Sequence, residues 1–230
     1  MTFGPLVYYI LIFSVHCLHM YYYLAFGILL AISLWTAGSY LAIMNLEEPA
    51  YTVLEKKDGY EIRRYEPYII AKTEVSGNYQ QTLNQGFGRI ADYIFGNNTA
   101  QTKIAMTAPV LEATSEKIAM TVPVNTSLEN SNTRTVSFVL PAKYTLDTLP
   151  TPNNPQVELQ AVPAKTVAAL RFNWYATENR VADKKLQLEQ LLTQDDRTMS
   201  GSIQVAQYNP PLSMPLTRRN EILIPIASSE

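Results

Sequence analysis

The chain has 230 residues, 47% of them hydrophobic, and a formal net charge of −2. This charge gives no reason to expect a nucleic-acid partner, because nucleic-acid binding requires a clustered basic surface. The length allows one ordinary domain with its own core beside a separate apolar segment.

The first 46 residues contain no Asp, Glu, Lys or Arg, so the 18 Lys and Arg and the 20 Asp and Glu all lie from Glu47 onward. A membrane-spanning helix needs about 20 apolar residues, and this stretch is about twice that length. We therefore divide the chain into a hydrophobic leader and transmembrane anchor (1–46) and a folded domain (47–230). The favoured interpretation is a single membrane anchor at 21–44 that follows a leader, with Met20 as a candidate translation start.

Two other interpretations of the apolar stretch stay open. A helical hairpin would use 5–19 and 21–44 as two spans. A cleaved signal peptide would use the small residues at 37–39, although no basic residue precedes the apolar run as signal peptides usually require. Charge gives no orientation, since Glu47 and Glu48 follow directly and acidic residues say little about topology.

The chain has one cysteine, Cys17, and two histidines, His16 and His19, all of them in the apolar stretch. No disulfide and no Cys-based metal site is therefore expected in the domain. At spacing i, i+3 the two histidines could share a helix face and bind a metal or haem. The favoured interpretation is that they are polar residues near a membrane boundary.

The domain begins with a predicted β-hairpin. Strands at 51–55 and 60–65 flank an Asp-Gly pair, a strong turn signal, and 68–75 alternates as a third strand. From 79–95 the apolar residues recur at helical spacing, and a Gly-Asn-Asn run at 96–98 ends the pattern.

Two nearly identical octapeptides follow, KIAMTAPV at 103–110 and KIAMTVPV at 117–124. Seven of the eight positions match, and both copies alternate with the period of a half-buried strand. The short spacing predicts two adjacent antiparallel strands that share one apolar face. Pro109 and Pro123 should lie at an edge, a bulge or a strand end, because proline cannot donate to a ladder.

The second half repeats this plan. After a strand at 135–140, the proline-rich loop 147–155 separates the halves. The remaining predicted elements are strands at 157–162 and 166–172, a helix at 178–192, and closing strands at 202–208 and 221–226. The sequence thus predicts an α+β fold, in which duplicated strand-helix-strand units form one antiparallel sheet or distorted β-barrel with two flanking helices.

Three segments carry a resemblance to the SOUL haem-binding family. They are the octapeptide KIAMTAPV, YEIRRYEPYIIAKTEVSGNY at 60–79 and YNPPLSMPLTRRNEILIPI at 208–226. The resemblance extends from about residue 48 to the end. It implies the same pseudo-symmetric architecture, shared with GyrI-type effector-binding domains, and a cleft for haem or porphyrin held non-covalently. Signal-anchored bacterial relatives further imply a membrane protein whose domain lies on the extracytoplasmic (periplasmic) side.

No catalytic constellation is visible in the sequence. The chain has no nucleophile elbow, no phosphate-binding glycine loop and no HExxH motif. Its domain also lacks His and Cys, the commonest general base and the commonest strong nucleophile. We therefore expect a binding protein and not an enzyme.

A porphyrin is flat and apolar with two propionates at one edge, so its pocket needs an apolar slot and one or two cations at the mouth. The first predicted helix offers slot residues, the octapeptides offer methionines, and two arginines precede the last strand. The candidate binding residues are Phe87, Ile90, Ala91, Ile94, Met106, Met120, Arg218 and Arg219. Each has an alternative role in core packing or ion pairing.

Haem iron is normally held by His, Cys, Met or Tyr, and the domain has no histidine. We expect binding through apolar contacts and propionates, without an axial histidine. The expected partners are a tetrapyrrole ligand and the membrane, reached through the N-terminal helix. Two other classes stay open: an effector-binding module for another flat amphipathic ligand, and an anchored module that recognises a protein segment.

Overall fold

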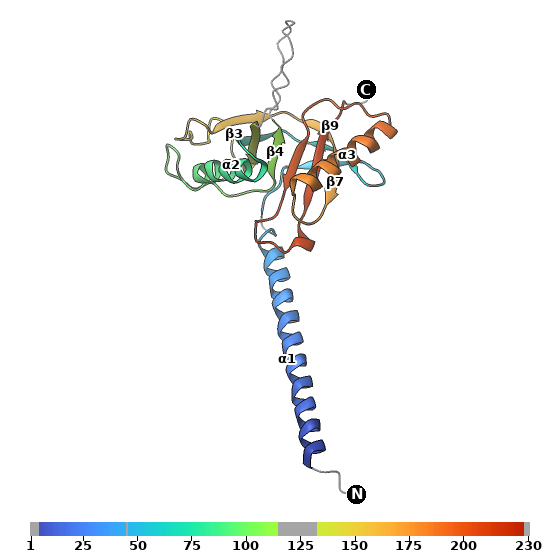
Figure 1. The fold of residues 1–230 in the computed structure, drawn as a ribbon. Helices are drawn as coiled ribbons and strands as arrows, with labels where there is room; N and C mark the ends of the chain where they lie inside the picture. Colours follow the sequence, from blue (N-terminus) through green and yellow to red (C-terminus); the bar gives the residue numbers. More distant parts are fainter. Residues whose placement is uncertain (1–4, 45, 115–132, 228–230) are drawn as a thin grey trace.

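The computed structural model describes residues 5–44, 46–114 and 133–227, as one long helix that projects from an α+β domain (Figure 1). Helix α1 (Pro5–Leu41) runs without a break through His16 and His19, so the two-span hairpin is not formed. Its part Leu18–Leu41, 24 residues, is long and apolar enough to cross a membrane. At 1.5 Å per residue it measures about 36 Å, which exceeds the roughly 30 Å of a bilayer's hydrocarbon core.

The domain is built on one nine-stranded antiparallel sheet within the described ranges, in the order β1-β2-β7-β9-β8-β4-β5-β3-β6. The strands are β1 (Tyr51–Lys56), β2 (Glu61–Tyr65), β3 (Tyr68–Ser76), β4 (Val110–Thr114), β5 (Thr133–Val139), β6 (Glu158–Val162), β7 (Lys165–Phe172), β8 (Gln204–Gln207) and β9 (Asn220–Pro225). The helices of the domain are α2 (Tyr79–Ile94), α3 (Glu178–Gln194) and the short 3-10 helix η1 (Pro215–Thr217). Within the domain and outside the octapeptides, each predicted element is confirmed with ends within two residues. The predicted anchor at 21–44 lies in a longer helix that begins at Pro5 and ends at Leu41.

The strand order confirms the predicted duplication. The unit β2-β3-α2-β4-β5 has the same sequence of elements as β6-β7-α3-β8-β9. In the sheet, β7-β9-β8 mirrors β3-β5-β4 across the central β4-β8 pair. The first strand of each unit joins the other unit, since β2 pairs with β7 and β6 pairs with β3. The two halves are therefore interlocked by exchanged strands and form one sheet.

Both helices cover the same face of this sheet. In the strand register Glu112 lies opposite Val136 and Val205, and Val205 lies opposite Ile222. Val136 packs in the apolar cluster under α2, and Ile222 packs in the cluster under α3. Because directly opposite residues point to the same side, we call this side the helix face and the other side the opposite face.

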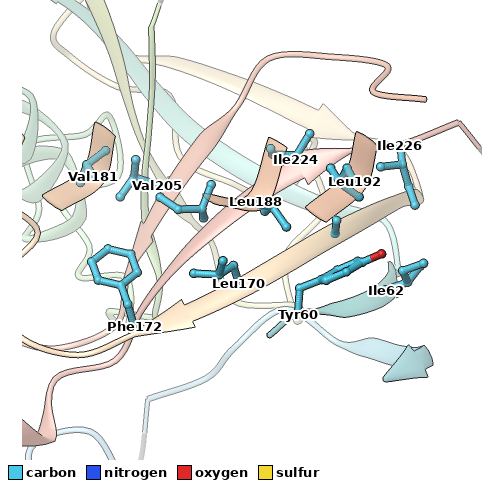
Figure 2. Packing of buried hydrophobic residues seen from close by; sticks show 12 residues of the cluster. Tyr60, Ile62, Leu170, Phe172, Val181, Leu188, Leu192, Val205, Ile224 and Ile226 are labelled. Atoms are coloured by element: carbon cyan, nitrogen blue, oxygen red, sulfur yellow. The ribbon is translucent and has the colours of Figure 1, made fainter. Parts of the chain in front are cut away.

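The cluster under α3 holds that helix in place (Figure 2). Leu188 and Leu192 of α3 are fully buried against Leu170 of β7 and Ile224 of β9. Burial of each such side chain contributes about 1.5–3 kcal/mol relative to exposure. Thr177 caps the start of the helix, because its hydroxyl oxygen accepts a hydrogen bond from the backbone of Arg180.

Helix α2 approaches its strands more closely than a side chain would allow. A Cβ on Gly86 would lie 2.5 Å from a methyl carbon of Val136 in β5, so only glycine fits at this contact. The helix begins at Asn78, whose side-chain oxygen accepts from the backbone of Gln81 at 2.9 Å. It ends before Gly96, whose φ of +121° suits glycine. The contact between Gly86 and Val136 fixes the distance of α2 from the sheet.

The hairpin predicted from the octapeptides is wrong for the first copy. Only its last residue, Val110, belongs to a strand, and β4 pairs with β5. The backbone N–H of Ile104 donates to Ile94, and that of Ala108 donates to Glu47. The Thr107 hydroxyl donates to the carbonyl of Val139. These hydrogen bonds take the place of a strand ladder, to which Pro109 could not donate in any case. The second copy, 117–124, lies outside the described residues.

Candidate ligand-binding site

A cavity of about 540 Å³ lies on the helix face, between α2, the centre of the sheet and the loop that precedes α3. This volume falls within the range of about 300–1,000 Å³ that is typical of small-molecule sites. The lining residues come from both halves of the duplication: Gln80, Leu83, Asn84, Phe87, Val110, Val136, Tyr175, Ala176, Thr177, Gln207, Asn209, Pro211 and Arg218.

One wall of the cavity is apolar. Leu83 and Phe87 lie one turn apart on α2, and Val110 and Val136 rise from β4 and β5 beneath them. The Phe87 ring is 37% exposed, and its centre lies 5.2 Å from the centre of the Phe138 ring. Such a wall offers a planar apolar molecule a surface on which to stack.

The cavity lining also includes the buried cation Arg218, which is only 5% exposed. Its Nη1 donates to the carbonyl of Pro211 at 2.8 Å, and its guanidinium lies 4.7 Å from the centre of the Tyr175 ring. Its Nε has no hydrogen-bond partner among the described residues, and none of their carboxylates forms an ion pair with it. Buried charges in proteins are normally paired, so this arginine has unused capacity to bind an anion.

Burial lowers the pKa of Arg218, and the neighbouring Tyr175 opposes this shift. An arginine stays protonated at neutral pH even so, since its ordinary pKa exceeds 12. The cavity therefore contains a permanent positive charge in a largely apolar setting. A carboxylate that reached Arg218 could accept hydrogen bonds from a guanidinium already stripped of much of its water.

Two loops bring Arg218 and Tyr175 together. The backbone N–H of Trp174 donates to Pro215 at 3.0 Å, and the Asn220 side chain donates to the carbonyl of Trp174 at 2.7 Å. These bonds join the segment before α3 to the segment before β9. Residues that are distant in sequence thus meet at one side of the cavity.

The structure places two of the predicted site residues in this cavity, Phe87 and Arg218. Ile90, Ala91 and Ile94 are buried against the sheet beneath α2, with 0%, 7% and 1% exposure, and do not line the cavity. Of the four slot residues predicted on α2, Phe87 therefore lines the cavity, while the other three are buried in the core.

The other predicted residues lie elsewhere. Met106 is half-buried against the cluster under α2, and Met120 lies outside the described residues. Arg219 contacts carboxylates, as its Nε donates to Glu221 and its Nη1 donates to Glu48, both at 3.0 Å. Of the two adjacent arginines, only Arg218 lines the cavity.

Arg219 belongs to a buried charge network centred on Glu221, which is 0% exposed. The Glu221 carboxylate accepts from Arg63 and from the Tyr208 hydroxyl, both at 2.8 Å. Burial alone would raise the pKa of Glu221, but the hydrogen bond from Arg63 and the charges of Arg219 and Arg63 hold that pKa below 4.5. Every charge in this network has a partner, which marks it as structural.

A second buried carboxylate, Glu112 of β4, lies on the helix face two residues beyond Val110. Its Oε1 accepts from Arg134 at 2.7 Å, while its Oε2 has no partner within the described part of the chain. Burial raises the pKa of Glu112, although Arg134 opposes the shift. This carboxylate ionises less readily than Glu221.

Sequence reasoning missed most of the cavity lining. Tyr175 lies in the loop between β7 and the capped start of α3. The one sign in the sequence that this residue could line a site was its aromatic side chain in a loop. Asn209 and Pro211 lie in a segment already noted for its family resemblance, but nothing in the sequence showed that it faces α2. These contacts depend on the pairing of β4 with β8, which brings the two halves together.

The fold and the cavity define a pseudo-symmetric α+β domain with a cavity at the junction of its halves. The family profile of the SOUL heme-binding protein matches residues 46–225, so the chain belongs to the SOUL family. It is 30% identical over 187 residues to Heme-binding protein 2 of Homo sapiens, covering 79% of this chain and 86% of that protein. It is 28% identical to Heme-binding protein 1 of Xenopus laevis, covering 73% and 84%.

Solved structures confirm the fold class. The C-terminal domain of EcmrR superposes with a TM-score of 0.54 at 12% identity, covering 78% of this chain and 99% of that domain. An uncharacterized conserved protein from Listeria innocua gives a TM-score of 0.50 at 9% identity, covering 74% and 93%. At these identities the likeness concerns the fold alone.

Proposed function

We propose that this protein binds a tetrapyrrole, haem or free porphyrin, in the cavity between α2 and the loop before α3, and that it buffers or delivers this ligand at a membrane. The observation that carries the proposal is Arg218, a buried cation without an acidic partner in the described chain, set in an apolar cavity of about 540 Å³. The names of the family and of its relatives support the same ligand class.

The residues present suit a porphyrin. Its flat face would pack on the wall formed by Leu83, Phe87 and Val136. A propionate would accept hydrogen bonds from Arg218, whose Nε has no other partner in the described structure. Bound haem would supply the apolar ring and the carboxylates, and the protein would supply the matching wall and charge.

Iron is not required in this account. Among the described residues, the cavity lining includes no His, Cys or Met, and only Tyr175 is of a type that ligates haem iron. Tyr175 stacks against Arg218. We therefore propose that the affinity depends on the porphyrin ring and its carboxylates, so that haemin and metal-free protoporphyrin IX bind with similar strength.

Titration of the detergent-solubilised chain with haemin and with protoporphyrin IX tests this function. We expect saturable micromolar binding of both, followed by the Soret band and by quenching of protein fluorescence. Absence of binding by either ligand would contradict the function. Much tighter binding of haemin than of protoporphyrin IX would contradict the binding mode.

We further propose that α1 is a single-pass anchor that holds the domain on the extracytoplasmic side. Length and composition of Leu18–Leu41 support a span. Lys56, Lys57, Arg63 and Arg64, the first basic residues after it, belong to or adjoin β1 and β2 and so carry no topology signal. A reporter that is active only outside the cytoplasm, fused to the C-terminus, tests the orientation. An inactive fusion would contradict the extracytoplasmic placement of the domain.

A further inference from the structure

The end of α1 is bonded to one loop of the domain, residues 209–217. The Trp35 Nε1 donates to the carbonyl of Leu212 at 2.9 Å. The Thr36 hydroxyl donates to the Met214 sulfur, and the Met214 backbone N–H donates to the Ser39 hydroxyl, both at 2.8 Å. Figure 1 shows the domain seated at this end of the helix, with the N-terminus at the far end.

This contact lies before the C-terminal end of the apolar helix α1. Trp35 precedes the last residue of α1, Leu41, by six positions, which is about 9 Å along the axis. The first charged residue, Glu47, comes six positions later still. Before Trp35, α1 has 30 residues (5–34), about 45 Å, which is enough to cross the hydrocarbon core. If α1 spans a bilayer and the charged domain stays outside the hydrocarbon, loop 209–217 therefore meets α1 in the interfacial layer and not in open water.

Three large apolar side chains are exposed at this loop and at the segment bonded to it. Leu212 is 86% exposed, Leu216 is 56% exposed and Trp174 is 48% exposed. Trp174 has a φ of +71°, which is unusual for a bulky residue, and is held there by its bonds to Pro215 and Asn220. Trp is enriched at membrane-water interfaces. We call Trp174, Leu212 and Leu216 the apolar patch.

The apolar patch adjoins the cavity. Tyr175 and Pro211, which line the cavity, are the direct chain neighbours of Trp174 and Leu212. Arg218 donates to the carbonyl of Pro211 and stacks on Tyr175, so it lies between the two loops. The surface beside α1 and the mouth of the cavity are therefore built from the same two segments.

We propose that the apolar patch inserts into the interfacial layer of the bilayer that holds α1, so that the cavity receives its ligand from the lipid. This inference rests on the proposed anchor and ligand. An amphipathic planar molecule dissolved in a bilayer keeps its carboxylates at the interface, because burying a charge in hydrocarbon is costly. Such a ligand would arrive with its carboxylates at the level of Arg218 and its ring toward the apolar wall.

Depth measurements on the full chain test the insertion. In a Cys17→Ser background, single cysteines at Leu30, Leu216 and Leu186 are labelled with an environment-sensitive NBD group and reconstituted into phosphatidylcholine vesicles. Leu186 of α3 is a matched control, since it is 55% exposed against 56% for Leu216. We expect blue-shifted emission, quenched by spin-labelled lipid, at positions 30 and 216 but not at 186.

Labels at the three positions distinguish a failure of the proposed patch insertion from a failure of the proposed membrane anchor. Quenching at 30 without quenching at 216 would overturn the insertion and leave the anchor intact. Absence of quenching at 30 would overturn both. Equal quenching at 216 and 186 would show non-specific lipid contact and would also overturn the inference.

Ligand transfer gives a second readout. Leu212→Asp should slow the uptake of protoporphyrin IX from vesicles several-fold, because an aspartate at the patch opposes insertion. Its affinity for the porphyrin in detergent should match that of wild type, since Leu212 does not line the cavity. Leu186→Asp is the control and should leave uptake unchanged. Equal uptake by Leu212→Asp and wild type would contradict the inference.

Discussion

Arg218 and Arg219 are adjacent in sequence but belong to two different regions of the molecule. Arg219 joins the Glu221 network, in which Arg63, Glu48 and Glu61 complete the ion pairs. Arg218 lies at the cavity on the helix face and forms no ion pair with a described residue. A buried cation that is neutralised by the fold stabilises the fold, whereas one left without a counter-ion is available to a ligand.

The burial of both residues shows that accessibility alone does not separate these roles. Arg218 is 5% exposed, and the Arg219 side chain is 19% exposed. Each guanidinium lies over a tyrosine ring, Tyr208 for Arg219 and Tyr175 for Arg218. What differs is the hydrogen-bond acceptors: two carboxylates for Arg219, and a backbone carbonyl for Arg218. The predictions below test this difference, beginning with the largest expected effect.

Glu221→Gln should cost about 3–5 kcal/mol of unfolding free energy, the scale for removing one partner of a buried ion pair. The substitution keeps the shape of the side chain but leaves Arg63 and Arg219 without their shared carboxylate. Urea unfolding of the detergent-solubilised chain measures it. Glu61→Gln is the control, because that carboxylate is 31% exposed and should cost under about 1 kcal/mol.

The network also predicts a pH dependence. The folded-state pKa of Glu221 is held below 4.5, so its contribution is present above pH 4.5 and is lost as the pH falls through the folded-state pKa. Wild type should therefore lose more stability in acid than Glu221→Gln. Parallel acid-unfolding curves would contradict the assignment of the charge to Glu221.

Ile90→Ala and Phe87→Ala should separate the core side of α2 from its cavity side. Ile90 is 0% exposed, and its truncation should cost about 2–5 kcal/mol of stability while the folded protein keeps its porphyrin affinity. Phe87 is 37% exposed and lines the cavity, so its truncation should mainly weaken porphyrin binding. Paired unfolding and titration curves measure both, and the reverse pattern would place the ligand at Ile90.

Glu112→Gln should change the stability at neutral pH by no more than about 1 kcal/mol. Burial raises the pKa of Glu112 in the folded state, so its ionised form costs stability above that pKa, and stability rises as the pH falls through it. In Glu112→Gln, the rise of the unfolding free energy with falling pH should therefore be smaller than in wild type. A large loss of stability would show that the pair with Arg134 is essential.

Most of the fold was predictable because its signals are local. The Asp-Gly turn between β1 and β2, the apolar spacing of α2 and α3 and the alternation of the strands depend on neighbours in sequence. The first octapeptide failed for a physical reason. Alternation indicates which side chains are buried. In the octapeptide before Val110, however, the backbone N–H groups of Ile104 and Ala108 donate to α2 and to Glu47, not to a neighbouring strand.

The site was predictable only in part. The family-like segment before β9 identified Arg218, and the pattern of α2 identified Phe87, but neither could show which of two adjacent arginines meets a carboxylate. That choice depends on Glu221, which faces away from the helices across the sheet. The contribution of Tyr175 depends on the bonds between two loops about 40 residues apart in sequence.

The most direct test of this account is a cycle of two arginine variants and two ligands. Affinities for protoporphyrin IX and for its dimethyl ester are measured in wild type, Arg218→Met and Arg219→Met, with unfolding curves to confirm that each variant is folded. We predict that Arg218→Met weakens binding of the diacid by about 1–3 kcal/mol, the scale of a lost charged hydrogen bond, and leaves binding of the ester unchanged. Arg219→Met should alter neither. An equal loss for acid and ester, or no loss in Arg218→Met, would contradict the assignment of Arg218 as the carboxylate-binding residue.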